Sequence, residues 1–322
     1  MDQEIKKTLV KRIDIISLGE VMVEFYSKDN VSLEQAKSFE KSLGGDTANL
    51  LYAASRFNKK CGFVGRVGND AFGKYLIDML KREGIDVSNT LVEDGSSTGI
   101  YFISSLKEGE RDFIYYRRDS AASHLSPTSV DSKYVSRCRI FHSSGISQAI
   151  SSSCREAVFK AAEIAKESGA LFSYDPNIRL KLWSSKTARE VVNYTLEMAD
   201  IVLSSLEDIK SIGYPDSPDD IAKKILKKGP KIVALKLGSS GSLVMSDKGR
   251  VRTPAFEVRA VDTTGAGDAF NGVFLVGVLE GWSLDKTARY ANAAAALKTL
   301  GRGAVSNVPT REEVSKFLRL SQ

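Results

Sequence analysis

Cysteine and histidine are scarce in this chain of 322 residues. It contains three cysteines, Cys61, Cys138 and Cys154, and two histidines, His124 and His142. An odd number of widely spaced cysteines predicts neither a disulfide framework nor a metal cluster. Two histidines leave little for zinc chemistry. Free thiols of this kind fit a reducing compartment, so we predict a cytoplasmic protein.

Long apolar runs and blocks of like charge are missing as well. The stretch from Met1 to Lys11 is charged and has no apolar segment of the signal-peptide type. No run approaches the 18 apolar residues of a membrane span, and no block of five or six like charges forms a nucleic-acid-binding arm. The sequence therefore predicts no membrane and no nucleic-acid partner. The net charge of +6 at pH 7 favours an anionic ligand instead.

What the chain does contain is an ordinary globular composition with regular alternation of strands and helices. Hydrophobic residues make up 42% and charged residues 27%, which allows a sizeable core. The predicted strands are Ile13–Leu18, Val21–Tyr26, Gln35–Leu43, Cys61–Val67, Ile140–Ser144, Leu171–Asp175, Ile201–Ser204 and Ile232–Lys236, with a hairpin at 238–250. The predicted helices are Thr47–Phe57, Ala71–Glu83, Ser152–Glu167, Lys186–Ala199, Pro218–Lys228, Gly265–Glu280 and Leu284–Leu300.

This alternation predicts one α/β domain over residues 1–322, with a central, mostly parallel sheet covered by helices on both faces. A segment with two β-rich stretches interrupts the alternation of strands and helices. Thr98–Ser104 and Asp112–Arg117 are β-rich and flank a charged turn at Leu106–Arg111, which predicts a hairpin. We expect this hairpin to belong to a small β-sheet lid made from about 20–45 and 97–120.

The most informative stretch is Val261–Gly272. The small residues Gly265, Ala266 and Gly267 open a long apolar helix, and Asp268 lies in its first turn. Small residues let backbone N–H groups face a ligand, and a helix N-terminus favours negative charge. The pattern predicts an anion hole beside a carboxylate that the helix keeps ionised, as a base requires. A tight turn followed by an ordinary first-turn acid is the alternative that a bare glycine motif leaves open.

The whole run resembles the second signature of the ribokinase (PfkB) family of carbohydrate kinases. The resemblance implies that Asp268 removes the proton from the acceptor hydroxyl and that the N–H groups of Gly265, Ala266 and Gly267 stabilise the transferring phosphoryl group. Positioning and charge stabilisation are what phosphoryl transfer requires. The resemblance extends from about residue 13 to residue 308 and implies a ribokinase-like fold.

Two glycine elements near the N-terminus resemble the family's first signature. Gly44–Asn49 matches its GGxxxN element, which implies that Gly45 lets the sugar lie against backbone and that Asn49 binds its hydroxyls. Asp46 is expected to be a helix N-cap rather than a ligand contact. Gly65–Gly73 matches the GxxGxDxxG element, and we expect it to form a structural strand-to-helix turn.

The nucleotide side matches the family less completely. The family's N-x-x-E element corresponds to Ser205-Leu206-Glu207-Asp208, where serine replaces asparagine and aspartate replaces glutamate. The resemblance implies ATP and Mg²⁺, with the metal held through water by Asp208 or, as an equally placed alternative, Glu207. A requirement for a monovalent cation such as K⁺ stays open. The predicted ATP contacts are Ser205, Lys236, Gly238, Gly241, Gly265, Ala266, Gly267 and Asn292; simple packing against alanines is the alternative for the last.

Phe113–Ala121 and Asp175–Trp183 resemble segments of 2-keto-3-deoxygluconate (KDG) kinases. This implies phosphorylation of the 6-hydroxyl of KDG, a sugar acid, to 2-keto-3-deoxy-6-phosphogluconate. Arginine forks match carboxylates, so Arg117 and Arg179 are assigned to the polar groups of the substrate, without a decision on which takes the carboxylate. Tyr101 and Tyr115, on paired strands, complete the predicted substrate contacts.

Other substrates and one other function class stay open. Fructokinases also carry an aromatic-Arg pair and a D-P-N-x-R element, so a neutral-sugar kinase is the first alternative, ahead of a nucleoside kinase. A non-catalytic sugar sensor on the same fold is the alternative of another class. Glu24 stands where many sugar kinases place an aspartate, and it either grips hydroxyls or faces away. The open edges of the lid predict a homo-oligomer formed through it.

Overall fold

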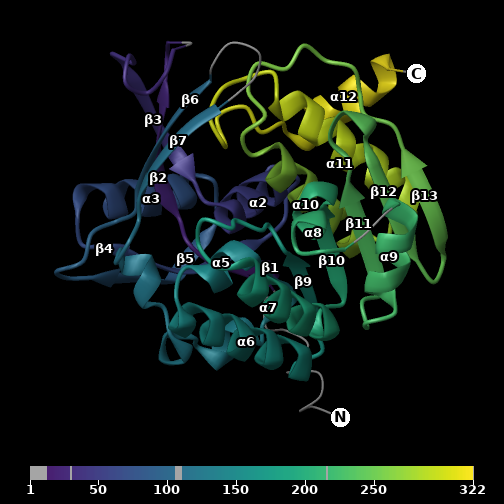
Figure 1. The fold of residues 1–322 in the computed structure, drawn as a ribbon, viewed down its shortest axis with the longest axis horizontal. Coiled ribbons are helices and arrows are strands. Elements are labelled where there is room, and N and C mark those ends of the chain that lie inside the picture. The colour runs from purple at the N-terminus through teal and green to yellow at the C-terminus, as the bar shows by residue number, and fades with distance from the viewer. Residues whose placement is uncertain (1–12, 30, 106–110, 215–216, 322) are drawn as a thin grey trace, which may run out of the picture.

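Two sheets organise the chain in the computed structural model, which describes residues 13–29, 31–105, 111–214 and 217–321 (Figure 1). The larger sheet has the strand order β13-β12-β11-β10-β9-β8-β1-β4-β5. Pairing is parallel from β11 to β5 and antiparallel at β12 and β13. Its strands are β1 (Ile13–Leu18), β4 (Cys61–Gly68), β5 (Asp86–Glu93), β8 (Cys138–Ser144), β9 (Leu171–Asp175), β10 (Ile201–Ser205), β11 (Ile232–Lys236), β12 (Ser242–Ser246) and β13 (Gly249–Thr253).

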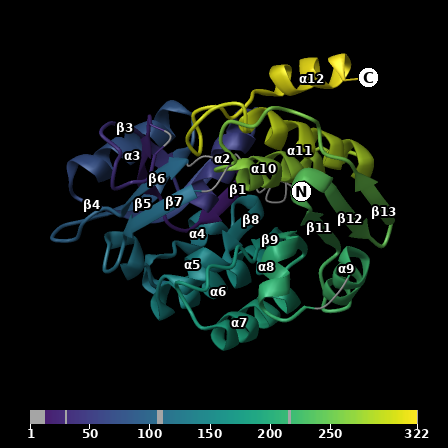
Figure 2. The ribbon, with the colours of Figure 1, turned by 45° about the horizontal axis from the view of Figure 1, so that its top comes forward.

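Helices cover both faces of this sheet, because successive strand residues point to opposite sides. Ile15 packs in one core and Ile16 in the other. In Figure 2 the two helical layers lie below and above the strands. The first layer contains α4 (Ser132–Val135), α5 (Gly145–Ala149), α6 (Ser152–Glu167), α7 (Ser185–Met198), α8 (Leu206–Ser211) and α9 (Pro218–Leu226). The second contains α2 (Asp46–Ser55), α3 (Ala71–Arg82), α10 (Ala266–Leu279), α11 (Leu284–Lys298) and α12 (Arg311–Leu320).

The smaller sheet has the order β3-β2-β6-β7 and lies at the opposite end of the molecule from β13 in both views (Figures 1 and 2). Its strands are β2 (Met22–Ser27), β3 (Phe39–Gly44), β6 (Ile100–Ser105) and β7 (Arg111–Tyr116). These strands fall within the ranges predicted for the lid. Most of the predicted turn at 106–111 lies outside the described residues.

The α/β architecture expected from the sequence is confirmed, with a mostly parallel sheet, helices on both faces and a small second sheet. Several elements differ from prediction, among them the short helices α4, α5 and α8, which were not predicted. The strand predicted at 35–43 is shorter and begins at Phe39. Strand β5 was not predicted, because an edge strand that is half exposed needs no apolar run. Helix α12 was also missed, although Thr310 and Glu313 form a capping box at its start.

Two further observations bear on the chemistry available to the chain. Cys61, Cys138 and Cys154 are buried free thiols. Among the residues described, no helix is long and apolar enough to cross a membrane.

Candidate active site

The predicted site residues converge where parallel strands end and two helices begin. Asp175 ends β9, Ser205 ends β10 and Lys236 ends β11, all at the carboxyl edge of the larger sheet. Helices α2 and α10 begin facing this edge and pack against each other along their lengths. Ligands of open α/β sheets bind at this edge, and anions bind at helix N-termini. The topology therefore gathers residues from distant parts of the chain into one site.

The amide of Asn49 orients the Asp268 carboxylate. Asn49 Nδ2 donates to Asp268 Oδ2 at 2.7 Å, which joins the first turn of α10 to α2. The other end of the amide, Asn49 Oδ1, is buried and has no hydrogen-bond partner among the described residues. A buried acceptor without a donor is costly, so it marks a position that a ligand hydroxyl can satisfy. The structure thus brings together Asn49 and Asp268, two residues that were predicted separately as site residues.

The surroundings of Asp268 favour its protonated form more than the sequence indicated. Burial is the largest cause that raises the pKa of Asp268, and the nearby carboxylates of Asp46 and Asp175 raise it further. The hydrogen bond from Asn49 and the charge of Lys236 act in the opposite direction. The resulting pKa is about 7. The helix N-terminus alone does not keep this carboxylate ionised, but a base with a pKa near neutrality suits proton removal at physiological pH.

Asp46 does not cap its helix, so the predicted N-cap role was wrong. The N-cap position of α2 is Gly45, whose φ of +116° and closeness to the Glu20 carbonyl leave no room for a side chain. Asp46 is the first residue of the helix. Its Oδ2 accepts a 2.7 Å hydrogen bond from Nδ2 of Asn177, which has a φ of +33°. Asp46 therefore fixes the loop after β9 against α2.

Lys236, predicted as an ATP contact, is the centre of a polar cluster next to the start of α10, and the sequence analysis did not assign the other members of this cluster to the site. Lys236 Nζ donates to Asp175 Oδ2 at 2.7 Å and to Asn271 Oδ1 at 3.1 Å. Asn271 Nδ2 donates to the same Asp175 oxygen at 2.6 Å. A Cβ placed on Gly267 would lie 3.6 Å from Lys236 Nζ. The cluster thus holds the ammonium group beside the start of α10, where a phosphoryl group would arrive. A carboxylate at the end of a buried parallel strand was the available signal for Asp175.

Backbone conformation prepares the start of α10 for an anion. Gly265 has a φ of +76°, and a Cβ at this position would lie 2.3 Å from the carbonyl oxygen of Ala304. Only glycine fits such a position without strain. The N–H of Ala266 donates to the Thr263 carbonyl at 3.2 Å, so it is shared with a turn. The N–H of Gly267, in the first helical turn, has no helical carbonyl to bind, as is general for helix starts.

Asp208 and Glu207, the two acids predicted as alternative metal contacts, lie in different surroundings. Ser205 caps α8, where its hydroxyl accepts from the Asp208 N–H at 3.0 Å. Burial and the Asp175 charge raise the pKa of Asp208, and its carboxylate lies 3.4 Å from the Arg179 guanidinium. Glu207, the helical residue before Asp208, is exposed. This favours Asp208 for a metal contact.

The remaining predicted ATP contacts flank β12. Gly238 and Gly241, with φ of +59° and +87°, form the turn between β11 and β12, and a Cβ on Gly241 would collide with the Thr253 carbonyl. Asn292 is buried, and its Nδ2 donates to the carbonyls of Thr253 at 3.2 Å and Pro254 at 3.1 Å. In the structure Asn292 therefore supports the backbone that follows β13.

Residues 12–311 match the description pfkB family carbohydrate kinase. The chain belongs to the pfkB family of carbohydrate kinases. Fructokinase-1 of Oryza sativa subsp. japonica is 35% identical over 314 residues, covering 94% of this chain and 97% of that protein. A solved structure of a putative ribokinase II from E. coli with ATP and Mg²⁺ has a TM-score of 0.89 and 29% identity, covering 96% of this chain and 99% of that one.

A third comparison concerns the predicted substrate of this carbohydrate kinase. The structure of 2-dehydro-3-deoxygluconokinase from Thermotoga maritima has a TM-score of 0.88 and 26% identity, covering 95% of this chain and 99% of that one. The family part of the prediction is therefore confirmed. The comparisons do not favour KDG kinases over other sugar kinases of the family, because curated relatives at 35% identity carry the name fructokinase.

On the acceptor side of the kinase, Tyr101 and Tyr115 face the site together, as their predicted strand pairing requires. They are direct partners in β6 and β7, and their rings stack with centroids 5.4 Å apart. The hydroxyl of Tyr101 donates to Glu24 Oε2 at 2.5 Å. The other oxygen of Glu24 accepts from the Ala304 N–H at 2.8 Å. Glu24 is fully buried and serves as a link between the small sheet and the loop at 301–304.

Both arginines assigned to the substrate already contact carboxylates of the protein. The Arg117 guanidinium forms an ion pair with Glu20, a residue that sequence analysis did not single out, and both side chains are largely buried. The Arg179 guanidinium lies 3.4 Å from Asp208 Oδ1 and donates to its neighbouring carbonyl at Ile178, with 51% of its side chain exposed. The charges of these two arginines are thus balanced locally.

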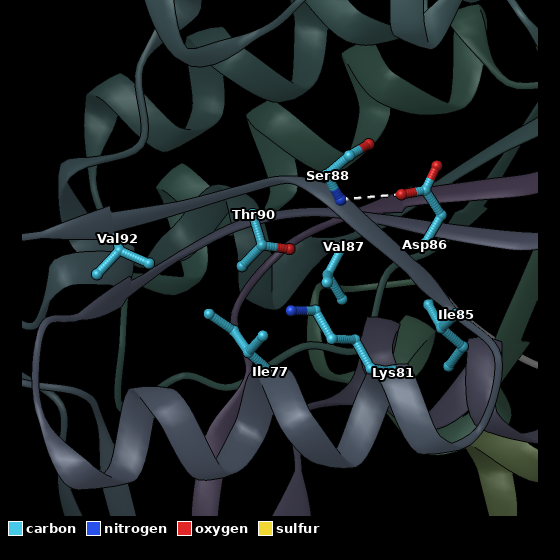
Figure 3. Close-up of a pocket in the computed structure, with 8 residues that line it drawn as sticks. All are labelled: Ile77, Lys81, Ile85, Asp86, Val87, Ser88, Thr90 and Val92. Atoms are coloured by element: carbon cyan, nitrogen blue, oxygen red, sulfur yellow. Dashed lines mark hydrogen bonds between the residues drawn. The ribbon is translucent and has the colours of Figure 1, made fainter.

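One surface cavity of the kinase lies away from this site. It has a volume of about 460 Å³ and is an open hollow lined mainly by residues of α3 and the edge strand β5 (Figure 3). Figure 3 shows Lys81 and Ile77 of the helix facing Thr90 and Val87 of the strand. None of the predicted site residues lines this cavity. We therefore identify the candidate site by its residues and its place at the carboxyl edge of the larger sheet, and not by this cavity.

Proposed function

We propose that this chain is an ATP- and Mg²⁺-dependent kinase for a neutral sugar, with fructose as the first candidate acceptor. The observation that carries this proposal is the pairing of Arg117 with Glu20 and of Arg179 with Asp208. An arginine that reads a substrate carboxylate must offer an uncompensated charge. The fructokinase names of relatives at 35% identity support the same acceptor class.

The Glu20–Arg117 pair argues most directly against a sugar acid. Burial raises the pKa of Glu20, and the Arg117 charge opposes that rise. A substrate carboxylate that took the place of Glu20 on Arg117 would leave a buried carboxyl group without its partner. Breaking a buried ion pair in this way costs several kcal/mol, about 3–5 by the usual measure. A neutral sugar requires no such exchange.

Catalysis in this proposal depends on three groups of the chain. The Asp268 carboxylate accepts the proton of the acceptor hydroxyl while Asn49 holds both in place. The backbone at Gly265–Gly267 and the Lys236 ammonium stabilise the charge on the transferring phosphoryl group. A protonated Asp268 cannot act as a base, so its elevated pKa predicts that activity falls as pH decreases through about 7.

Nucleotide and metal contacts follow the same arrangement. The glycine turns at Gly238 and Gly241 and the serine cap at Ser205 offer backbone and hydroxyl groups to ATP. Among the described residues no three His, Cys, Asp or Glu side chains form a metal cluster. The donors present therefore fit Mg²⁺ bound mostly by phosphates and water, with Asp208 as the protein carboxylate. The ion when bound neutralises phosphate charge.

A sugar acid such as KDG is the second candidate, and one observation favours it. Half of the Arg179 side chain is exposed, and its distance of 3.4 Å to Asp208 is long for a charged hydrogen bond. If Asp208 turns toward Mg²⁺, Arg179 becomes available to a substrate carboxylate. The 2-dehydro-3-deoxygluconokinase from Thermotoga maritima has the same fold.

The experiment is a coupled ADP-release assay with Mg-ATP and equal concentrations of fructose, KDG, its galactonate epimer, ribose and adenosine. We expect the highest kcat/KM with fructose. Highest efficiency with KDG would overturn the neutral-sugar proposal and retain the kinase. Binding of sugar by calorimetry without ADP release from any acceptor would favour the sensor alternative.

Asp268→Asn is the matched variant for this assay, because an asparagine oxygen can still accept from Asn49. We expect sugar and ATP affinity to stay within a few-fold and kcat to fall by about 100-fold or more, the usual effect of losing a general base. An active Asp268→Asn enzyme would remove Asp268 from the role of base.

A further inference from the structure

Lys298, the last residue of α11, is fully buried, with 0% of its surface exposed. Lysine is among the residues least often found in that position, because its ammonium group loses water on burial. Burial lowers the pKa of Lys298, while the charges of Asp262, Glu24 and Asp268 oppose that decrease. The proposed catalytic chemistry does not involve Lys298. Its retention inside the molecule needs a separate explanation.

The Lys298 ammonium lies between two loops and contacts the backbone of each. Its Nζ donates to the Asp262 carbonyl at 3.4 Å and to the Gly301 carbonyl at 3.3 Å. Asp262 begins the loop that leads into α10, and Gly301 belongs to the loop that follows α11. Both contacts are long for hydrogen bonds, so much of the attraction is that of a charge for two oriented carbonyl dipoles.

The Asp262 carboxylate joins the same two loops from the other side. Oδ1 accepts from the Thr264 N–H at 2.9 Å and from the Thr264 hydroxyl at 2.7 Å, whereas Oδ2 accepts from the Gly303 N–H at 2.9 Å. Burial would raise the pKa of Asp262, but the Lys298 charge and these hydrogen bonds outweigh it and hold the pKa below its ordinary value. Asp262 and Lys298 thus balance each other inside the molecule.

These loops form one wall of the anion hole. The glycine at 265, which opens it, rests against the Ala304 carbonyl with no space for a side chain. The Val261 and Asp262 N–H groups both donate to the Thr299 carbonyl, at 2.7 and 3.1 Å. A small displacement of the loop at 301–304 would therefore move the backbone N–H groups that face the phosphoryl group. Displacements of about 1 Å at a catalytic site can cost on the order of 100-fold in rate.

We propose that Lys298 is a positioning residue whose buried ammonium group clamps the loop at 261–265 to the loop at 301–304 and so fixes the anion hole. Without it, the Asp262 and Gly301 carbonyls lose this donor and the Asp262 carboxylate loses its counter-charge. The clamp also extends to the small sheet, because Glu24 of β2 binds the Ala304 N–H of the same loop. This inference rests on the proposed kinase function of the site.

The test compares Lys298→Met, which keeps the length of the side chain and removes the charge, with Lys160→Met as a control. Lys160 also donates to a backbone carbonyl, that of Pro127 at 2.7 Å, but it lies on α6, away from the site. We expect Lys298→Met to reduce kcat by about 100-fold, with KM for sugar and ATP changed less than about threefold, as for a displaced anion hole. Lys160→Met should keep the wild-type kcat.

A second variant, Lys298→Ala, leaves a space lined by carbonyl oxygens and a carboxylate, which suits a small monovalent cation. We expect ammonium or potassium chloride to restore its kcat by at least about tenfold, whereas tetramethylammonium, which is too large, should not. This readout separates the loss of a charge from a general loss of packing. Wild-type activity should not depend on which of these cations is present.

Hydrogen exchange of the ligand-free protein tests the clamp independently of any activity. We expect faster exchange at 262–267 and 301–304 in Lys298→Met than in the wild type, with unchanged exchange in α6. Unchanged exchange in both loops, or a Lys298→Met enzyme with wild-type kcat, would overturn the proposal. If the wild type phosphorylates none of the acceptors, the proposed function fails, and the exchange data alone decide whether the clamp exists.

Discussion

Around Asp268, neighbouring carboxylates determine the pH range in which the base can act. Burial and Asp46 raise the pKa of Asp268 to about 7, so the pH profile of kcat/KM should rise up to about that pH and then level off. Asp46→Asn removes the nearest like charge and keeps an oxygen that can accept from Asn177. We therefore expect the acidic limb of the kcat/KM profile to move to lower pH, by up to about one unit.

The control for this shift is Asp247→Asn, since Asp247 is exposed in the turn between β12 and β13. It changes the net charge of the protein equally and should leave the acidic limb in place. Profiles of the three proteins should be measured at the same ionic strength, because salt screens interactions between charges. An acidic limb that stays in place in Asp46→Asn, or moves upward, would contradict the role of Asp46.

Residues within one motif could be predicted, whereas partners from distant segments could not. Asp268 and Asn49 are recognisable because the spacing around them is local, and the structure joins them by a hydrogen bond. The Glu20 partner of Arg117 is set by tertiary packing, and nothing in the surrounding sequence indicates it. The sequence favoured a sugar acid because two segments resemble those of KDG kinases and arginine forks match carboxylates, whereas only the structure shows that Arg117 already contacts Glu20.

Among the elements, the start of α10 depends on one glycine conformation. Gly265 and Gly84 both have a φ of +76°, but a Cβ on Gly84 would have no neighbour within 4 Å, whereas one on Gly265 would overlap the Ala304 carbonyl. Gly84→Ala should therefore cost only the strain of the left-handed conformation, about 1–2 kcal/mol in the free energy of unfolding. Gly265→Ala should cost about 3 kcal/mol or more and also reduce kcat by about 100-fold.

Denaturant unfolding and steady-state kinetics of the two alanine variants measure this difference. The pair isolates the contact with Ala304, because φ is the same at both positions. Equal losses of stability would show that the loop at 301–304 moves aside without cost. A Gly265→Ala enzyme with wild-type kcat would contradict the anion-hole role of this backbone.

Elements were predictable where burial imposes a strong pattern. The buried strands β8 to β11 and the long helices α6 and α10 were all predicted within a few residues, because their apolar residues follow a clear period. Strand β5 pairs with β4 only, at the edge of the sheet, and its sequence is mostly polar. Helix α12 follows a capping box that could have identified it.

For the whole molecule, the small sheet has apolar side chains on both faces. One face carries Tyr101 and Tyr115 toward the site. The other carries an aromatic group in which Phe102 stacks on Phe25 and meets the edge of Tyr116. Tyr116 is 62% exposed and Ile114, on the same strand, is 43% exposed. A sheet with two apolar faces and an open edge at β7 is expected to bind a second surface of the same kind.

We therefore predict that the protein is a homo-oligomer assembled through this outer face. Sedimentation equilibrium should give a multiple of the 35.2 kDa chain mass for the wild type. Tyr116→Glu should shift the protein to monomers, because it introduces a charge into an apolar contact. Val92→Glu is the matched control: Val92 is 54% exposed on β5, outside the small sheet, and its replacement should leave the oligomer intact. Dissociation by Val92→Glu and not by Tyr116→Glu would place the interface on the edge of the larger sheet instead.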